Sequence, residues 1–295
     1  MAKSSKGKSG PGKSGPGKSG PGKSGPGKSG PGKSGPGKSG IDLKRARILV
    51  TNDDGINAPG LKVLVKLAKT LSDDVWVVAP ESEQSATSHS LTLRRPLRER
   101  RLGSKRFSVD GTPTDCVLVA HHRILADRLP DLVLSGINDG GNLAEDVTYS
   151  GTIAATMEAA LLGIPAIAFS QQRGEDGIAR WKVPEVFLPD IVRKLVKMRW
   201  TKDLLVNVNF PAVAPEDVTG IEVCRQGRRD EGTTVNETFD PSGRRFLWIG
   251  GYQLDTSEER DSDLAVTAKG GISVTPLHLD LTHRASMKSL RELFG

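Results

Sequence analysis

The chain has 295 residues, of which 42 are basic and 35 are acidic, so its formal net charge is +7. The excess lies in the first 40 residues, which contain nine lysines and no acidic residue. The remainder has 33 basic and 35 acidic residues, a net charge of −2. This balance argues against a specific nucleic-acid surface on the rest of the chain. We expect only weak, salt-sensitive contact with nucleic acid through the N-terminal segment.

Residues 1–40 form a tail in which the unit Gly-Lys-Ser-Gly-Pro repeats from Lys8 onward. The unit has no large apolar side chain, so burial cannot offset the entropy of ordering it, and the tail is predicted to be disordered. A period of five excludes a collagen triple helix, which needs glycine at every third position. The sequence leaves open whether the tail is a natural low-complexity extension or an added linker.

Residues 41–295 are predicted to form one α/β domain with an appendage. The two cysteines, Cys116 and Cys224, lie far apart and have no histidine partners at zinc-ligand spacing. No apolar run approaches the roughly 20 residues that cross a bilayer, and no signal-peptide core follows Met1. We therefore expect a cytoplasmic protein without a membrane partner.

Apolar runs alternate with segments of helical period between residues 47 and 209. The amphipathic patterns predict helices at 60–71, 152–162 and 184–198, with a further helix starting near Pro113. The apolar runs predict strands at Arg47–Thr51, 75–79, 132–134, 166–170 and 204–209. This alternation predicts a three-layer, Rossmann-like fold with a mostly parallel sheet covered on both faces. The basic stretch 94–106 is predicted to be the exposed face of a hairpin.

The pattern changes from residue 220 onward. Val235–Phe239 and Arg245–Ile249 flank the turn sequence Asp-Pro-Ser-Gly, which predicts a long β-hairpin. A strand at 272–276 and a short helix from Ala285 complete the chain. A hairpin with few core residues that protrudes from an α/β body often makes subunit contacts, so the segment of about 220–295 is predicted to mediate oligomerisation.

Polar residues follow the first predicted strand, at the edge of the sheet where open α/β folds bind ligands. Asp53 and Asp54 are adjacent there, and such a pair of carboxylates is unfavourable unless a cation neutralises it. Carboxylate oxygens are natural ligands of Mg²⁺ and Mn²⁺. Gly55 permits close approach of the backbone to a phosphate. The alternative is a turn in which the aspartates cap backbone amides.

Three further strand exits carry suitable groups. Ser85 lies in the loop 80–90, where small hydroxyls either complete a metal shell or are ordinary loop residues. Asn138 and Asn142, in a glycine-rich loop, offer a carbonyl to a metal and amide donors to phosphate oxygens. Ser150 precedes a predicted helix whose N-terminus can bind an anion, although a simple N-cap is the commoner role. Together the four exits favour hydrolysis of a phosphate ester.

The motifs ILVTNDDGINAPG, GTPTDC, SGINDGGN, YSGTIAATMEAALLGIPAIAFS, VNVNFP and TPLHLDLT resemble those of the SurE family in order and spacing. The resemblance extends from about Arg47 to His283. It implies hydrolysis of nucleoside 5′- and 3′-monophosphates, with some members also cleaving short-chain polyphosphate. It also implies a homodimer or homotetramer formed through a swapped C-terminal region.

The resemblance further implies the roles of individual residues. Asp53, Asp54, Ser85 and Asn138 match the positions that hold one divalent cation (Mg²⁺, Mn²⁺ or Co²⁺), and Asn142 with Ser150-Gly151-Thr152 matches the phosphate-contacting positions. We interpret Asp53 as the residue that assists deprotonation of water or attacks directly, and Asp54 as the more committed metal ligand. Asp139 departs from the family, which places Ala or Arg there. An additional carboxylate would repel phosphate or bind a second cation.

Three alternatives remain open at this stage. A haloacid-dehalogenase-type phosphatase also has aspartates after its first strand, but separated by one residue, unlike Asp53 and Asp54. A nucleotide-sensing module would bind the same ligands without hydrolysis. An RNA-associated protein would act through the tail. His89, in the Ser85 loop, is weighed as a substrate contact against a structural role.

Overall fold

The computed structural model describes residues 40–229, 234–250 and 260–295. The predictions for the repeat tail therefore lie outside the described residues, apart from Gly40. Among the described residues, no helix combines the length and apolar character needed to cross a membrane.

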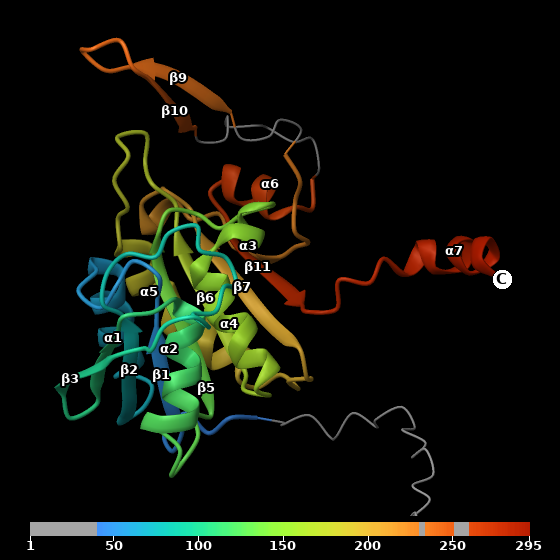
Figure 1. Cartoon of the computed structure of the whole chain (residues 1–295). Coiled ribbons are helices and arrows are strands. Elements are labelled where there is room, and N and C mark those ends of the chain that lie inside the picture. The colour runs from blue at the N-terminus through green and yellow to red at the C-terminus, as the bar shows by residue number, and fades with distance from the viewer. Residues whose placement is uncertain (1–39, 230–233, 251–259) are drawn as a thin grey trace, which may run out of the picture. The chain divides into compact units, whose positions relative to one another are not determined.

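A nine-stranded sheet forms the centre of the fold, in the order β3-β4-β2-β1-β5-β6-β7-β11-β8 (Figure 1). The six strands from β4 to β7 run parallel, and β3 and β11 are antiparallel to their inner neighbours. The predicted mostly parallel sheet is therefore confirmed. The strands are β1 (Arg47–Thr51), β2 (Asp74–Pro80), β3 (Glu99–Gly103), β4 (Arg106–Val109), β5 (Leu132–Asp139), β6 (Ala166–Gln171), β7 (Leu204–Phe210), β8 (Ile221–Val223) and β11 (Ile272–His278).

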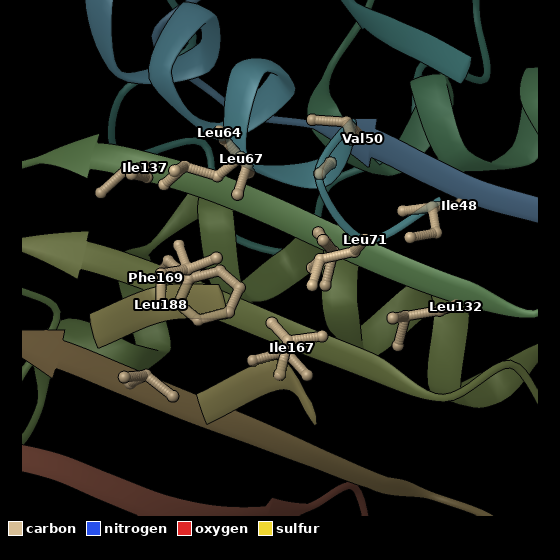
Figure 2. Packing of buried hydrophobic residues seen from close by; sticks show 14 of the residues in the cluster. Ile48, Val50, Leu64, Leu67, Leu71, Leu132, Ile137, Ile167, Phe169 and Leu188 are labelled. Atoms are coloured by element: carbon tan, nitrogen blue, oxygen red, sulfur yellow. The ribbon is translucent and has the colours of Figure 1, made fainter. Parts of the chain in front are cut away.

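Helices cover both faces of this sheet, which makes the three layers predicted from the sequence (Figure 1). Helices α1 (Pro59–Ala68) and α5 (Lys182–Leu195) share one core cluster with the sheet, while α2 (Pro113–Val119) and α4 (Gly151–Leu161) share another. Figure 2 shows part of the first cluster, in which sheet and helix side chains interdigitate: Ile48, Val50, Leu64, Leu67, Leu71, Leu132, Ile137, Ile167, Phe169 and Leu188. Burial of these side chains is the main favourable contribution to folding.

The remaining helices are short. The first continues the helix predicted to start near Pro113, the last two form the short helix predicted from Ala285, and the other three were not predicted. In chain order, the remaining helices are the π-helical turn η1 (Ala120–Ile124), α3 (Asp146–Tyr149), η2 (Pro215–Asp217), α6 (Asp263–Ala268), η3 (Arg284–Ser286) and α7 (Met287–Phe294). Their lengths, between three and eight residues, leave too few positions for a helical period to be recognised in the sequence.

The third predicted strand is longer than expected. Residues predicted to form a glycine-rich loop instead extend β5 to Asp139, with a shift of register against β6 between Ser135 and Asn138. Gly136 explains this difference, because its φ is +126° and a Cβ there would lie 2.3 Å from the carbonyl oxygen of Phe169. Only glycine allows the strand to pass its neighbour so closely.

The predicted hairpin is present as β9 (Val235–Phe239) and β10 (Arg245–Ile249), which form a separate two-stranded sheet. Its turn is closed by Asp240, whose carboxylate accepts hydrogen bonds from the backbone N–H groups of Ser242 (2.8 Å) and Arg244 (2.9 Å). All residues of the two strands are exposed in the single chain. The role of this hairpin in subunit contact stays a prediction.

Candidate active site

The predicted site lies where the order of the strands reverses. Strand β1 is flanked by β2, which follows it in the chain, and by β5, which pairs with its other side. Because all three strands are parallel, their carboxyl ends open at the same edge of the sheet. Such a switch point leaves a crevice between the loops that diverge to either side. The exits that carry Asp53 and Asp54, Ser85, and Asn138 are therefore neighbours.

Asp53 is buried beneath this edge, with 4% of its surface exposed. Its Oδ1 accepts a short hydrogen bond from the hydroxyl of Thr152. Burial raises the pKa of Asp53, while hydrogen bonds from Thr152 and from the backbone of Gly151 oppose this increase. The amides at the start of α4 therefore stabilise the charged form of Asp53.

Helix α4 reaches Asp53 because its first residue is glycine. A Cβ at Gly151 would lie 2.7 Å from the Cβ of Asp53, so any side chain would push the helix away. Ser150 caps this helix by accepting a hydrogen bond from the backbone N–H of Ile153 (3.1 Å), which is the alternative role predicted for it. Roles of Ser150, Gly151 and Thr152 toward phosphate stay predictions.

Asp54 lies closer to solvent, next to the end of β5. Its Oδ2 accepts a hydrogen bond from the backbone N–H of Asp139 (3.3 Å). Desolvation, and after it the negative charge of Asp53, raises the pKa of Asp54 to about 7. A divalent cation beside these two neighbouring carboxylates would favour their charged forms.

The other two predicted metal ligands have suitable atoms. The hydroxyl of Ser85 donates to Oε1 of Glu83 (2.7 Å), which leaves its oxygen lone pairs for another partner. The Nδ2 of Asn138 donates to the carbonyl oxygen of Gly140 (3.0 Å), so the amide oxygen remains as the ligand atom. Both residues thus present an oxygen.

A cavity of about 640 Å³ lies over these residues. Six of the nine predicted site residues line it: Asp53, Asp54, Ser85, Asn138, Asn142 and Ser150. The other three predicted residues do not line the cavity. Gly151 and Thr152 lie behind Asp53, and the carbonyl oxygen of Gly55 accepts a hydrogen bond from Nδ2 of Asn52 (3.0 Å). The cavity is also lined by Glu83, Ala86, Asp139, Gly141, Asp146, Tyr149, Arg173, Ile249 and Gly250.

The donor set fits a hard divalent cation. Within the described part of the chain, no group of three or more His, Cys, Asp or Glu residues could hold a metal ion. A cation at this site would therefore take two carboxylates together with hydroxyl and amide oxygens. An all-oxygen set of this kind suits Mg²⁺ or Mn²⁺ better than metals that prefer sulfur or nitrogen.

Strand β7 contributes residues that hold the Asn142 loop in place and that sequence reasoning had not assigned a role. The carbonyl oxygen of Asn142 accepts hydrogen bonds from Nδ2 of Asn207 (2.8 Å) and Nδ2 of Asn209 (3.1 Å). The backbone N–H of Asn142 donates to Oδ1 of Asn209 (2.8 Å). Its side-chain Nδ2 donates to Oγ of Ser170 (2.8 Å), which leaves one amide hydrogen for a ligand. Alternating asparagines within the apolar strand LLVNVNF were the available signal.

The segment after Asn142 is braced by the C-terminal part of the chain. Asp263, which is fully buried, accepts a hydrogen bond from the backbone N–H of Ala144 (3.0 Å). Arg229 forms an ion pair with Asp146 (2.8 Å). Residues far along the chain therefore fix the loop that carries Asn142.

The Ser85 loop is tied to the helical layer through His89. Its Nε2 lies 3.0 Å from Oε2 of Glu158 on α4. The neighbouring Ser88 hydroxyl donates to the carbonyl oxygen of Thr148 (2.8 Å). His89 does not line the cavity, so its observed role is structural.

Fold and site together define a class: a three-layer α/β protein with a site of paired carboxylates and further oxygen donors at the strand switch point. The family model described as survival protein SurE matches residues 48–233, so the chain belongs to the SurE family.

Individual relatives support the same assignment. A protein of Paramagnetospirillum magneticum named 5′-nucleotidase SurE is 53% identical over 253 residues, which cover 86% of this chain and 97% of the relative. One of Rhodospirillum rubrum with the same name is 51% identical over 256 residues, covering 86% and 98%. The crystal structure of the SurE protein from Aquifex aeolicus is similar with a TM-score of 0.73 and 41% identity, over 84% of this chain and 99% of that one.

Proposed function

We propose that this chain is a metal-dependent 5′-nucleotidase that hydrolyses nucleoside monophosphates to nucleoside and phosphate. The observation that carries the proposal is the convergence of Asp53, Asp54, Ser85 and Asn138 from three neighbouring strand exits on one cavity. The relatives named 5′-nucleotidase SurE support the choice of substrate. We extend the proposal to nucleoside 3′-monophosphates and to short-chain polyphosphate as further substrates.

We propose one divalent cation per subunit, Mg²⁺, Mn²⁺ or Co²⁺, with oxygens of Asp53, Asp54, Ser85 and Asn138 as its ligands. When bound, such a cation supplies positive charge to phosphoryl oxygens and makes water more acidic. Asp54 is proposed as the more committed ligand, because it lies closer to solvent at the cavity, whereas Asp53 is buried and holds a hydrogen bond from Thr152.

Asp53 is proposed to accept the proton of the attacking water, or to attack directly. Thr152 occupies Oδ1 of Asp53, so Oδ2 is the atom that can accept a proton. Burial raises the pKa of Asp53 and so favours acceptance of a proton by its carboxylate. Appearance of ¹⁸O from labelled water in the Asp53 carboxylate after a single turnover would favour direct attack over base catalysis.

The phosphoryl group is proposed to lie against Asn142 and the start of α4. One Nδ2 hydrogen of Asn142 remains available, and the positive end of the α4 dipole lies behind Asp53. A donor directed at charge that develops in the transition state typically contributes a few kcal/mol.

Phosphate release from AMP, measured with Mg²⁺, Mn²⁺ or Co²⁺ and with EDTA, tests the proposal. Asp53→Asn and Asp54→Asn should each remove cation-dependent turnover, whereas Asp73→Asn, at an exposed position outside the cavity, should leave it unchanged. Binding of AMP without release of phosphate by the wild type would favour a nucleotide-sensing module. Near-normal turnover by either active-site variant with saturating Mn²⁺ would refute the ligand assignment.

We propose that the chain acts in the cytoplasm as a homodimer or homotetramer formed through its C-terminal region. Exposed apolar side chains on the hairpin, including Leu247 at 60% and Trp248 at 64% exposure, support a surface that is covered in the assembly. Light scattering should show a smaller particle for Leu247→Glu. Ile178→Glu, at 58% exposure elsewhere on the surface, is the matched control. An unchanged mass for Leu247→Glu would contradict this arrangement.

A further inference from the structure

We infer that Arg173 contacts the phosphoryl group of the substrate and that Asp139 is the residue that positions it. This inference rests on the proposed function, which it deepens by naming a recognition residue. Neither residue belongs to the ligand set described above, and Arg173 follows β6, a strand exit that the sequence analysis had not considered.

The excess of acidic side chains around the cavity makes a cationic residue favourable for binding a phosphoryl group. Five carboxylates line it: Asp53, Asp54, Glu83, Asp139 and Asp146. Among the described residues that line it, Arg173 is the one with a cationic side chain. A phosphate monoester is a dianion near neutral pH, and one divalent cation offsets only two of the negative charges. A guanidinium on the cavity wall lowers the remaining repulsion.

The position of the guanidinium is set by Asp139. The Nε of Arg173 donates to Oδ1 of Asp139 at 2.7 Å, and the backbone N–H of the same Asp139 donates to Oδ2 of Asp54 at 3.3 Å. One residue therefore links the proposed metal ligand to the guanidinium. The hydrogen bond to Asp139, opposed by desolvation and supported by the negative charges of Asp139, Asp54 and Glu83, raises the pKa of Arg173, so its side chain lies within the electrostatic field of the site.

The contact with Asp139 leaves the terminal nitrogens of the Arg173 guanidinium accessible. Only Nε takes part, so both terminal Nη groups can donate to another partner. The side chain is 55% exposed and borders the cavity. A planar guanidinium with two free nitrogens matches two oxygens of a phosphoryl group, a geometry that lysine cannot reproduce.

The backbone at Arg173 is anchored well enough to direct the side chain. The preceding N–H, of Gln172, donates to the carbonyl oxygen of Phe210 (2.9 Å), and Arg173 itself forms a β-bridge with Ala179. Arg173 thus begins a closed turn directly after a central strand, and it is not part of a free loop.

Binding of inorganic phosphate to the full-length protein tests the inference without requiring turnover. Isothermal titration calorimetry with saturating Mn²⁺ should show phosphate binding roughly 10- to 100-fold weaker for Arg173→Ala than for the wild type, as expected for a lost charge-assisted hydrogen bond. Arg173→Lys should recover only part of the affinity. Arg180→Ala is the matched control, because Arg180 lies in the same turn, pairs with Asp176 and does not line the cavity.

The positioning role of Asp139 predicts a coupling that a general structural role would not produce. Asp139→Asn should weaken phosphate binding about 3- to 10-fold in the wild-type background. In the Arg173→Ala background it should leave binding unchanged or strengthen it, because only the repulsion between the carboxylate and phosphate is then removed. Equal effects in both backgrounds would refute the positioning role. Phosphate binding by Arg173→Ala equal to that of the wild type, or no phosphate binding by the wild type, would overturn the inference.

Kinetics separate this inference from the proposed function. For Arg173→Ala, kcat/KM should fall by a similar factor with AMP and with p-nitrophenyl phosphate, because the two substrates share only the phosphoryl group. A loss confined to AMP would place Arg173 against the nucleoside and refute the phosphoryl contact. A wild-type protein that binds phosphate through Arg173 but hydrolyses neither ester would end the proposed function and leave the inference standing.

Discussion

Replacing Asp54 by asparagine should stabilise the protein in the absence of metal, although the same change removes activity. The folded-state pKa of Asp54 is about 7, against 3.8 for the unperturbed side chain, because the carboxylate is desolvated next to Asp53. The difference of about 3 pKa units, at about 1.4 kcal/mol per unit, sets a ceiling of about 4 kcal/mol. Since Asp54 retains partial contact with solvent, we expect about 1–2 kcal/mol.

The sign of this effect determines its pH dependence. Because the folded-state pKa is above the unfolded value, the folded protein binds the Asp54 proton more tightly than the unfolded chain does. The free energy of unfolding therefore falls as pH rises from about 4 to about 7, and the Asp54 contribution is constant above that range. The advantage of Asp54→Asn should be largest at pH 8 and absent near pH 4.

Thermal unfolding in EDTA at pH 4, 6 and 8 measures the effect. For a domain of this size, about 1–2 kcal/mol corresponds to a rise in Tm of roughly 2–8 °C. Addition of Mn²⁺ should raise the Tm of the wild type but not that of Asp54→Asn, since a ligand stabilises only the state that binds it. A variant less stable than the wild type at pH 8 in EDTA would show that Asp54 is not strained by its surroundings, and the reasoning would fail.

Three further changes probe the supports of the site. Gly151→Ala should lower kcat more than 10-fold, because the added methyl group would displace α4 from Asp53; a circular dichroism spectrum like that of the wild type would show that the loss is local. His89→Gln should weaken Mn²⁺ binding about 3- to 10-fold by loosening the Ser85 loop, and calorimetric Mn²⁺ affinity equal to the wild type would contradict this. Asn209→Ala should reduce the free energy of unfolding by about 1–3 kcal/mol and raise KM for AMP, because the backbone N–H and the backbone carbonyl of Asn142 each lose a hydrogen bond to Asn209. Urea unfolding measures the first effect, and kinetics with AMP measure the second.

The alternation of strands and helices, read from periodicity, predicted the layers and the parallel sheet because each pattern is set by local burial. The polar residues at the carboxyl ends of β1, β2 and β5 could also be identified from the sequence, because polar residues directly after an apolar run mark the end of a strand. The continuation of β5 through Ser135–Asp139 could not be predicted, because it depends on how closely Gly136 passes Phe169.

The hydrogen-bond partners of individual side chains also could not be predicted from the sequence. Whether the hydroxyl of Thr152 serves a phosphate or Asp53 depends on a contact between residues 99 positions apart. Arg173 was missed because it follows β6 by two residues in a stretch without a recognisable motif, and its relation to Asp139 arises only when β5 and β6 lie side by side. Pairwise geometry of this kind is fixed by tertiary packing.

The origin of the proposed ligands in three separate strand exits has a consequence for the order of folding. Asp53 and Asn138 are brought together only after β1 has paired with β5, and Ser85 joins them only after β1 has also paired with β2. An unfolded chain therefore presents only the adjacent Asp53 and Asp54 to a cation. The ion can therefore bind only when most of the sheet has formed. Metal should then slow unfolding many-fold while leaving the refolding rate nearly unchanged. The cation would thus stabilise the folded molecule without directing its assembly.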